Sequence, residues 1–411
     1  MNKDCIRFGV IGIGCRGAAH LKYLVTLEDV IVTAVCDKYT DRAEKGAEIV
    51  SKNHPAPLCT VDYHDVIASA EVDAVLIFTD WELHIPIAIE AMRAGKAVAS
   101  EVAGAYSVND CYRLVQTWEE TRVPFMFLEN CCYNKEELMV TAMARDGQFG
   151  TIVHCSGAYS HDLREEIAYG KENRHYRLRN YLFRNTENYP THELGPIAKL
   201  LNINRGNRMV SLVSAASKAC GMKEYVKKNA DKVDPALLDA EFHQGDIVNT
   251  VITCAGGETI LMTLDTTLPR SYNRAFTVRG TKGMYEMGTH SLFFDGEEEC
   301  FEPLDYYKKA IGNAEAKEST YLPDVWKGIT PEEIAAGHGG MDSVMWRSFI
   351  DALKNGEEMP LDVYDAAAWM AITALSEESI AKGGTPVEIP DFTSGQWLLR
   401  APKDVMDLPK A

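Results

Sequence analysis

The first 130 residues alternate short apolar runs with longer segments of helical spacing. The runs lack polar alternation, which is typical of strands buried on both faces of a parallel sheet. They fall at 6–11, 30–36, 74–78, 97–100 and 125–128, and the helical segments at about 15–27, 39–53, 84–94 and 107–120. Ser107 is placed to cap the last of these helices. The pattern predicts an α/β domain with a doubly wound parallel sheet over residues 1–130.

The period changes to two after Asn130. A helix over 135–145 precedes strands expected at 151–159, 209–215, 247–254, 259–265, 275–280 and 284–287. Short turns between them favour a large, mostly antiparallel open sheet with one covered face. Two late helices, at 341–354 and 363–382, are expected to cover that face, and the polar stretch 300–340 is expected to be a surface insertion. Residues 131–411 therefore form an α+β second domain.

Composition narrows the possible partners. Sixty acidic and 42 basic residues give a formal net charge of −18, which argues against nucleic acid and anionic membrane surfaces. No apolar run is long enough to span a membrane, and charged residues interrupt the first ten positions. Eleven cysteines without zinc-type spacing suggest reduced thiols. We expect a cytoplasmic protein that acts on a small molecule, can assemble as a homo-oligomer and binds no metal.

A glycine motif follows the first predicted strand. Gly12, Gly14 and Gly17 form G-x-G-x-x-G between a strand and a helix, and Asp37 ends the second strand 20 residues later. In this context the glycines let the backbone approach a pyrophosphate, and the helix N-terminus supplies free N–H groups. Asp37 can accept from ribose hydroxyls and would repel a 2′-phosphate. The motif therefore predicts a Rossmann domain that binds NAD rather than NADP, with Arg16 able to reach a phosphate.

Polar residues also follow three later strands of this domain. They are Thr79–His84, Glu101-Val102 and Glu129-Asn130. Because ligands of open α/β sheets lie outside the carboxyl ends of the strands, we expect these segments to line one crevice. Two alternatives stay open here: Trp81 as a packing residue and His84 as a helix cap.

Residues 160–190 interleave five arginines with four tyrosines. A solvated charged face is one interpretation of this segment. A long, irregular, aromatic-rich loop is often functional, and tyrosine and arginine suit polyhydroxylated ligands. The arginines are Arg164, Arg174, Arg177, Arg179 and Arg184, and the tyrosines Tyr169, Tyr176, Tyr181 and Tyr189.

These features together resemble the Gfo/Idh/MocA oxidoreductases, and within them the NAD-dependent glycosidases of glycoside hydrolase family 109. The shared segments run in order along nearly the whole chain. They are Gly12–Gly17, Trp81–His84, Glu101-Val102, Leu128–Tyr133, Gly157–Leu163, Tyr189–His192 with Gly195-Pro196, Asn204–Gly206, Arg270–Tyr272 and Gly337–Asp342. Sugar dehydrogenases of the superfamily usually carry Glu-Lys-Pro where this chain has Glu101-Val102-Ala103, which favours the glycosidase branch.

The resemblance implies two sets of ligand contacts. Cofactor contacts are implied at Cys15, Arg16, Asp37, Trp81, His84, Glu101, Val102 and Asn130, and sugar contacts at Tyr159, Arg177, Tyr189, His192 and Tyr272. Glu193 departs from the family, which has glycine after Thr-His, so the family's N-acetylgalactosaminide preference does not transfer directly.

The family's chemistry implies hydrolysis by transient C3 oxidation, C1–C2 elimination, water addition and re-reduction. Tyr159 is a candidate base for the C2 proton, provided that a nearby arginine lowers its pKa. His192 suits the hydroxyl proton because an imidazole titrates near neutrality. Weaker candidates are His161, Glu193 and His338.

Other functions stay open from the sequence. One is a plain NAD-dependent sugar or polyol dehydrogenase, which would release NADH; another is a non-catalytic sugar or dinucleotide sensor. A metal site at His192, Glu193, His154 and His161 fits no zinc signature.

Overall fold

The computed structural model describes residues 5–296 and 303–410. The chain divides into two compact units. The first comprises Met1–Asn134 and Val325–Ala367, and the second Lys135–Asp324 and Ala368–Ala411. Residues 325–367, which the sequence pattern had assigned to the second domain, thus group with the first unit.

The first unit contains a six-stranded parallel sheet in the order β3-β2-β1-β4-β5-β6. Its strands are β1 (Ile6–Ile11), β2 (Val30–Cys36), β3 (Leu58–Thr60), β4 (Ala74–Ile77), β5 (Ala97–Ser100) and β6 (Phe125–Phe127). This is the doubly wound order of dinucleotide-binding folds, with the switch of direction between β1 and β4. The predicted parallel sheet is confirmed, and β3 is the strand that the pattern did not predict.

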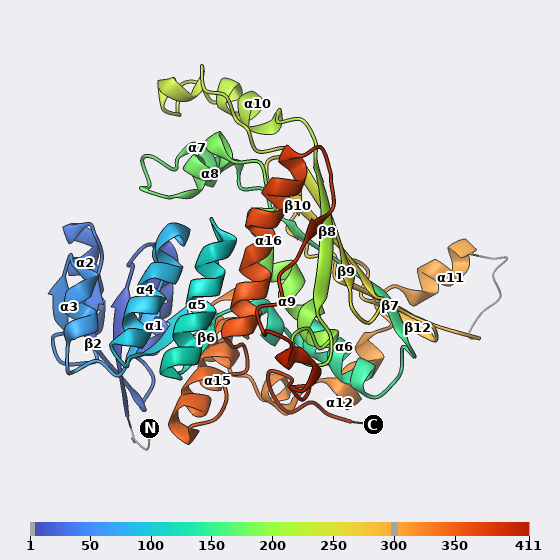
Figure 1. Cartoon of the computed structure of the whole chain (residues 1–411), viewed down its shortest axis with the longest axis horizontal. Helices are drawn as coiled ribbons and strands as arrows, with labels where there is room; N and C mark the ends of the chain where they lie inside the picture. The colour runs from blue at the N-terminus through green and yellow to red at the C-terminus, as the bar shows by residue number, and fades with distance from the viewer. Residues whose placement is uncertain (1–4, 297–302, 411) are drawn as a thin grey trace. The chain divides into compact units, whose positions relative to one another are not determined.

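Helices connect these strands and pack in neighbouring pairs, α1 against α2 and α4 against α5 (Figure 1). They are α1 (Cys15–Leu24), α2 (Thr40–Val50), α3 (Tyr63–Ala68), α4 (Trp81–Arg93), α5 (Val108–Thr121) and the 3-10 turn η1 (Asn130–Tyr133). The hydroxyl of Ser107 accepts from the Asn109 N–H and caps α5 as predicted.

The late segment adds helices to this unit. They are α14 (Pro331–Ala335), the turn η3 (His338–Gly340) and α15 (Met341–Asn355), while α13 (Asp324–Lys327) and α16 (Val363–Ala381) cross the unit boundary. The prediction that the helix at 341–354 covers the antiparallel sheet is wrong. Trp346 and Phe349 of α15 pack on Phe8 of β1, with ring centroids 6.4 and 6.1 Å from the Phe8 ring. The aromatic side chains of α15 therefore pack against the apolar strand β1.

The second unit contains an eight-stranded sheet in the order β13-β12-β11-β7-β10-β9-β8-β14. Its strands are β7 (Ile152–Ser160), β8 (Met209–Ala216), β9 (Ile247–Cys254), β10 (Thr259–Asp265), β11 (Thr277–Gly280), β12 (Gly283–Glu286), β13 (Ser291–Phe294) and β14 (Val387–Glu388). Only the β7–β10 pair is parallel among these described strands. The predicted, mostly antiparallel sheet is confirmed.

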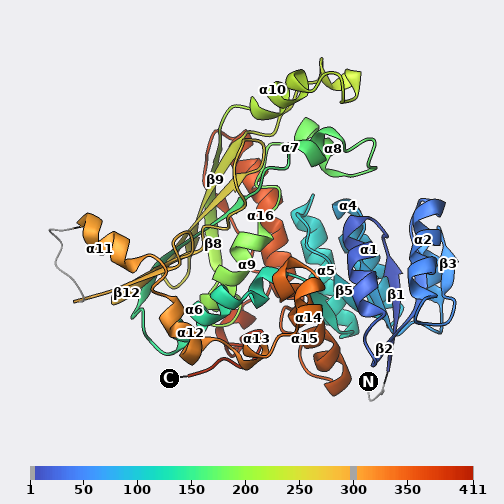
Figure 2. The same cartoon turned by 180° about the vertical axis from the view of Figure 1, so that it is seen from behind.

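Helix α9 and the later part of α16 cover one face of this sheet. Gly157 of β7 lies so close to α9 that a Cβ there would be 3.0 Å from the Glu193 Cβ. Ser379 of α16 accepts from the Ser214 N–H of β8. Figure 2 shows the sheet from behind, with α11 beside its β13 edge.

Two irregular segments of the predicted second domain are more ordered than expected. Residues 160–190 contain two short helices joined by turns. The described part of 300–340 contains several short helices, with Tyr321 and Trp326 buried, and residues 300–302 lie outside the described residues. The helices of this unit are α6 (Lys135–Arg145), α7 (Arg164–Ala168), α8 (Arg177–Phe183), α9 (Thr191–Leu200), α10 (Gly221–Lys228), α11 (Pro303–Ala310) and α12 (Glu315–Tyr321), with the turns η2 (Pro235–Leu237) and η4 (Gln396–Leu398).

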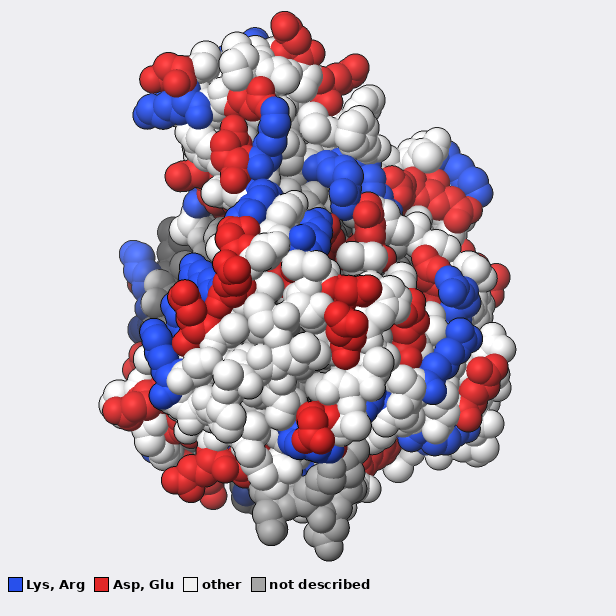
Figure 3. Space-filling view, turned by 90° about the vertical axis from the view of Figure 1, so that its left-hand side faces the viewer, with Lys and Arg blue, Asp and Glu red and all other residues white. Residues whose placement is uncertain are grey.

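The surface and the thiols agree with the acidic, cysteine-containing composition. On the face drawn in Figure 3, acidic and basic side chains are interspersed instead of gathered by sign. Ten cysteines lie in the described residues, and all ten are free thiols. Across the same residues, none of the helices has the length and apolarity that crossing a membrane requires.

Candidate active site

The glycine turn of the first unit has the backbone that a dinucleotide requires. Gly12 adopts φ +96°, and a Cβ there would lie 2.5 Å from the Phe78 carbonyl oxygen. A Cβ on Gly17 would lie 1.9 Å from the Gly12 oxygen, so glycine is required at both positions. Gly14 caps α1, and the nearest atom to a Cβ placed there would be Arg42 Nη1, at 3.8 Å. The first turn of α1 contains no acidic residue. These features fit a pyrophosphate at the helix N-terminus.

Asp37 anchors this turn at the end of β2. Its carboxylate accepts from the Ile13 N–H at 2.8 Å and from the Tyr39 N–H at 3.0 Å, and the residue is buried. A carboxylate has about four acceptor positions. Two backbone bonds therefore leave capacity for ribose hydroxyls, and the fixed negative charge fits NAD.

An ion-pair network links the turn to the end of β5. Arg16 Nε donates to the Glu101 carboxylate at 2.7 Å, and the second Glu101 oxygen accepts from the Val102 N–H at 2.7 Å. Burial raises the pKa of Glu101, but Arg16, His20 and the Val102 N–H together outweigh it. The pKa of Glu101 therefore lies well below its ordinary value, and its negative charge persists in the closed interior of the unit.

The Arg16 guanidinium also binds a second carboxylate, that of Asp342 in α15. Nη1 and Nη2 donate to its two oxygens at 2.7 and 3.0 Å. Asp342 also accepts from the Asn130 amide at 2.8 Å, and His338 Nδ1 lies 3.0 Å away. Burial opposes the ionised form, yet His338 and Arg16 hold the pKa of Asp342 well below its ordinary value. Sequence reasoning expected Arg16 to contact a phosphate and did not identify Asp342.

Two buried histidines pack around this network. Trp346 donates to Nδ1 of His20 at 2.8 Å, and burial followed by the Arg16 charge lowers the pKa of His20. His84 lies between the carbonyl oxygens of Thr79 and Glu101, at 3.0 and 2.9 Å. His84 therefore joins two strand ends. It is not the cap of α4, because Asp80 occupies that position.

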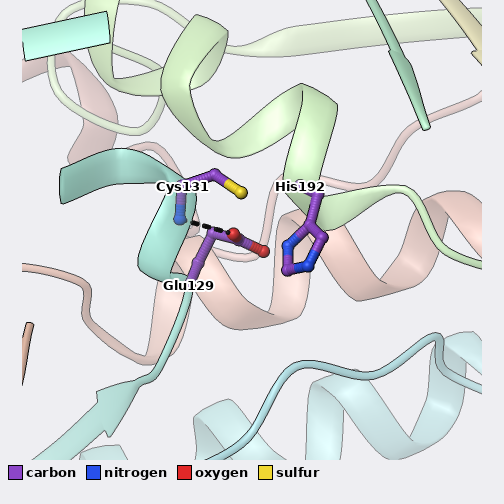
Figure 4. A group of neighbouring side chains, drawn as sticks. All are labelled: Glu129, Cys131 and His192. Atoms are coloured by element: carbon purple, nitrogen blue, oxygen red, sulfur yellow. Dashed lines mark hydrogen bonds between the residues drawn. The ribbon is translucent and has the colours of Figure 1, made fainter. Parts of the chain in front are cut away.

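The three predicted strand-end segments do gather at one edge of the sheet. His84 and Arg16 connect Thr79–His84 and the turn to Glu101, and Asp342 connects Arg16 to Asn130. Trp81 is buried at the start of α4, as the packing alternative proposed. The buried Glu129 accepts from the Cys131 N–H at 3.0 Å, as the dashed line in Figure 4 shows.

The second unit contains a cluster of aromatic rings at the end of β7. The Tyr159 ring lies 4.6 Å from the Tyr189 ring, 5.6 Å from the His192 ring and 6.5 Å from the Tyr272 ring. The Tyr159 hydroxyl lies 3.2 Å from His161 Nδ1. Four of the five predicted substrate-site residues, and the weaker candidate His161, thus share one cluster.

Arg177, the fifth residue, borders this cluster. Its guanidinium carbon lies 4.9 Å from the Tyr189 ring centroid, and its Nε lies 2.6 Å from a Glu166 carboxylate oxygen. Arg177 is 8% exposed, whereas Tyr272 is 48% exposed. The site therefore has a buried charged end and an open aromatic end, which suits a polyhydroxylated ligand.

His192 is the second residue of α9, from whose first turn its ring extends in Figure 4. Its Nε2 lies 3.4 Å from the Tyr189 hydroxyl. Burial raises the pKa of Tyr159 above its ordinary value, and the Arg177 charge opposes this only in part. The condition stated for Tyr159 as a base, a lowered pKa, is therefore not met in this structure. Burial and Arg177 lower the pKa of His161, which favours a neutral imidazole beside the phenol.

Two buried carboxyl groups, Glu187 and Glu193, lie near this cluster in the chain. Within residues 5–296 and 303–410, the side-chain oxygens of both lack a hydrogen-bond partner. Burial raises the pKa of Glu187, and burial together with the Glu187 charge raises that of Glu193. Both carboxyls therefore favour the protonated form. Sequence reasoning noted Glu193 as a departure from the family and as a weaker candidate. It missed Glu187, which lies in no recognisable motif.

Comparison with protein families defines the class. Residues 6–128 match the model described as oxidoreductase family, NAD-binding Rossmann fold. Residues 133–399 match the model described as glycosyl hydrolase 109, C-terminal domain. The chain is therefore an NAD-binding protein of the oxidoreductase fold class. It belongs to glycosyl hydrolase family 109.

Full-length relatives agree with this assignment. The alpha-N-acetylgalactosaminidase of Tannerella forsythia is 36% identical, with 97% of this chain and 88% of the relative aligned. A glycosyl hydrolase family 109 protein of Stenotrophomonas maltophilia strain K279a is 37% identical, with 97% and 91% aligned.

Solved structures with low sequence identity share the fold. Levoglucosan dehydrogenase in complex with NADH has a TM-score of 0.68 at 17% identity, covering 94% of this chain and 99% of that one. Scyllo-inositol dehydrogenase of Lactobacillus casei, with NAD(H) and scyllo-inositol bound, has a TM-score of 0.63 at 15% identity, covering 94% and 99%. They share the two-domain fold of this chain.

Proposed function

We propose that this NAD-dependent glycosidase hydrolyses its substrate through a redox-neutral cycle that begins at a sugar C3–OH. The observation that carries the proposal is the Tyr159–His161–His192 cluster, in which Tyr159 and His192 are buried. The cluster contains proton donors and acceptors instead of two ionised carboxylates. A direct displacement would need such a carboxylate pair. The nearest buried carboxyls in the chain, Glu187 and Glu193, favour the protonated form.

Bound NAD supplies the reversible oxidation that turns C3 into a ketone and so acidifies the neighbouring C2–H. The protein's own residues then need to move protons and bind the sugar. We assign the proton of the C3 hydroxyl to His192, whose ring lies beside the Tyr189 hydroxyl. We assign the C2 proton to Tyr159 acting together with His161.

The Tyr159–His161 pair answers the difficulty that a buried phenol is a weak base. The two side chains lie 3.2 Å apart, and His161 favours the neutral form. As Tyr159 oxygen accepts the C2 proton, its own proton passes to His161 Nδ1. The aglycone leaves C1 with the bonding electrons of the broken C1–O bond, and water adds to the resulting C1–C2 double bond.

The remaining residues bind and orient the sugar. Arg177 and Tyr272 border the cluster and offer donors to sugar hydroxyls or to the keto oxygen, while Tyr189 adds an apolar ring. For the cofactor, we propose that Gly12, Gly14, Cys15 and Arg16 surround the pyrophosphate. Asp37 accepts from the adenosine ribose, and the ends of β4, β5 and β6 hold the nicotinamide half through Trp81, His84, Glu101, Val102 and Asn130.

The test combines product analysis with isotope labelling. Nitrophenyl glycosides, beginning with the α-N-acetylgalactosaminide because a relative is named for that activity, are hydrolysed in heavy water. The cycle predicts free nitrophenol without added NAD, deuterium at C2 of the product and no accumulation of NADH. Hydrolysis without label at C2 refutes the cycle, and stoichiometric NADH with an intact glycoside identifies a dehydrogenase instead.

We also propose a homo-oligomer that is located in the cytoplasm. Val153, Val213 and Val251 expose 50, 37 and 43% of their surface on strands β7, β8 and β9, which supports self-association through the open sheet face. The free thiols support a reducing compartment. Light scattering of the purified protein and fractionation of the native cells test the two statements.

A further inference from the structure

The first turn of α1 is held by a residue 326 positions further along the chain. Asp342 is 1% exposed and receives two hydrogen bonds from Arg16 and one from Asn130. Arg16 belongs to the glycine turn, and Asn130 follows β6. One buried carboxylate thus contacts a residue that follows the central strand β1 and a residue that follows the edge strand β6.

A glycine-rich loop brings Asp342 to this position. Gly337, His338, Gly339 and Gly340 have φ values of +141, +47, +65 and +104°, four consecutive left-handed residues. A Cβ on Gly337 would lie 2.3 Å from a carboxylate oxygen of Asp342. Glycine is therefore required where the loop passes the carboxylate, and the strained backbone is used to place it.

Arginine is effective at a binding site only when its flexible side chain is held in place. The contact from Nε to Glu101 fixes one edge of the Arg16 guanidinium. The two further bonds to Asp342 fix its plane, because a bidentate pair defines an orientation as well as a distance. Arg16 lies in the first turn of α1, whose free N–H groups suit a pyrophosphate.

We propose that Asp342 is a positioning residue of the cofactor site. It holds Arg16 and Asn130 in the arrangement that accepts a dinucleotide before the dinucleotide arrives. The proposal rests on NAD binding, which membership of the family establishes, and not on the redox cycle described above. The two can therefore fail independently.

The test measures binding of two cofactor fragments to Asp342→Asn, which keeps the shape and removes the charge. ADP-ribose contains the pyrophosphate, and adenosine does not. We expect the Kd for ADP-ribose to rise at least about tenfold, since small misplacements of binding groups are costly. Adenosine binding, measured by NMR, should not change. Asp351→Asn is the matched control, because Asp351 lies on the same helix, is exposed and pairs with Arg347.

A double-mutant cycle excludes a merely structural role. If Asp342 acts through Arg16, Asp342→Asn should add little to the loss caused by Arg16→Lys. Should Asp342→Asn melt below the assay temperature, Asp342→Glu keeps the charge, and we expect it to show a smaller loss confined to ADP-ribose. Unchanged or tighter ADP-ribose binding, an equal loss of adenosine binding, or additive losses in the cycle would each overturn the proposal.

Discussion

Two pairs of buried carboxyl groups have opposite electrostatic settings in this protein. Glu101 and Asp342, in the first unit, surround one arginine and accept further hydrogen bonds from Val102 and Asn130. Their pKa values lie well below the ordinary range. The pKa values of Glu187 and Glu193, in the second unit, are raised by burial.

The difference follows from what surrounds each pair: Arg16 contacts Glu101 and Asp342, whereas burial dominates at Glu187 and Glu193. A cofactor edge benefits from fixed charges that need no rearrangement when the ligand arrives. We propose that the second unit exchanges protons with a neutral sugar, a role that suits uncharged groups. The same side chain therefore serves opposite purposes, according to whether a cation lies beside it.

The largest expected effect tests the proton-transfer role proposed for the second unit. Tyr159→Phe removes only the hydroxyl that contacts His161, and removing a positioned acid or base typically costs roughly 100- to 10,000-fold in rate. The melting temperature and bound NAD should be retained. Steady-state hydrolysis by this variant is compared with that of Tyr307→Phe, an exposed tyrosine. Near-normal turnover would remove Tyr159 from the chemistry.

The second prediction tests the ionised pair of carboxyl groups in the first unit, Glu101 and Asp342. Glu101→Gln leaves Arg16 with one carboxylate fewer in a buried network, and breaking such a pair costs about 3–5 kcal/mol. Because the pKa of Glu101 is lowered, its stabilisation is present above the unfolded-state pKa and is lost as the pH falls through the folded-state value. Thermal melts at pH 7 should show a large destabilisation; an unchanged melting temperature would contradict the electrostatic interpretation.

A third prediction concerns cofactor choice at the ionised edge. The Asp37 carboxylate, fixed by two backbone N–H groups, should oppose a 2′-phosphate by several kcal/mol, or about 100-fold in affinity. Titration of protein stripped of cofactor with NAD and NADP measures the ratio. Asp37→Asn should reduce the preference for NAD over NADP, mainly by improving NADP binding. Equal affinity of the unaltered protein for both cofactors refutes the assignment.

The smallest expected effect concerns the pH dependence of folding stability, which has opposite sign for the two pairs of carboxyl groups. Raised pKa values mean that Glu187 and Glu193 favour the folded state most at low pH, and this contribution is lost as the pH rises from the unfolded-state value toward the folded-state one. Glu193→Gln should therefore raise the melting temperature at pH 8.5, by a few degrees for a change of roughly 1 kcal/mol, and alter it little at pH 5. The exposed Glu224→Gln is the control. A lower melting temperature for Glu193→Gln at pH 8.5 would show that the carboxylate is stabilised.

The spacing of apolar residues predicted most of the fold, because the strands of the two sheets have different patterns: continuous apolar runs in the first sheet and alternation in the second. Buried runs of β1, β4 and β5 and the alternation of β9 and β10 were recognisable, and the bounds of β9 and β10 match the prediction. The short strands β3 and β14, of three and two residues, carry too little pattern to be recognised.

The sequence by itself determined the glycine turn, Asp37 and the residue types of both sites, since each depends on short motifs and strand ends. Only the tertiary structure decided that α15 packs on β1, because its apolar stripe fits either sheet equally well in sequence. It also decided that Asp342 binds Arg16, 326 positions away in the sequence, and that burial raises the pKa values of Tyr159 and Glu193. Charge state depends on which groups surround a side chain in space, and the order of residues does not contain that information.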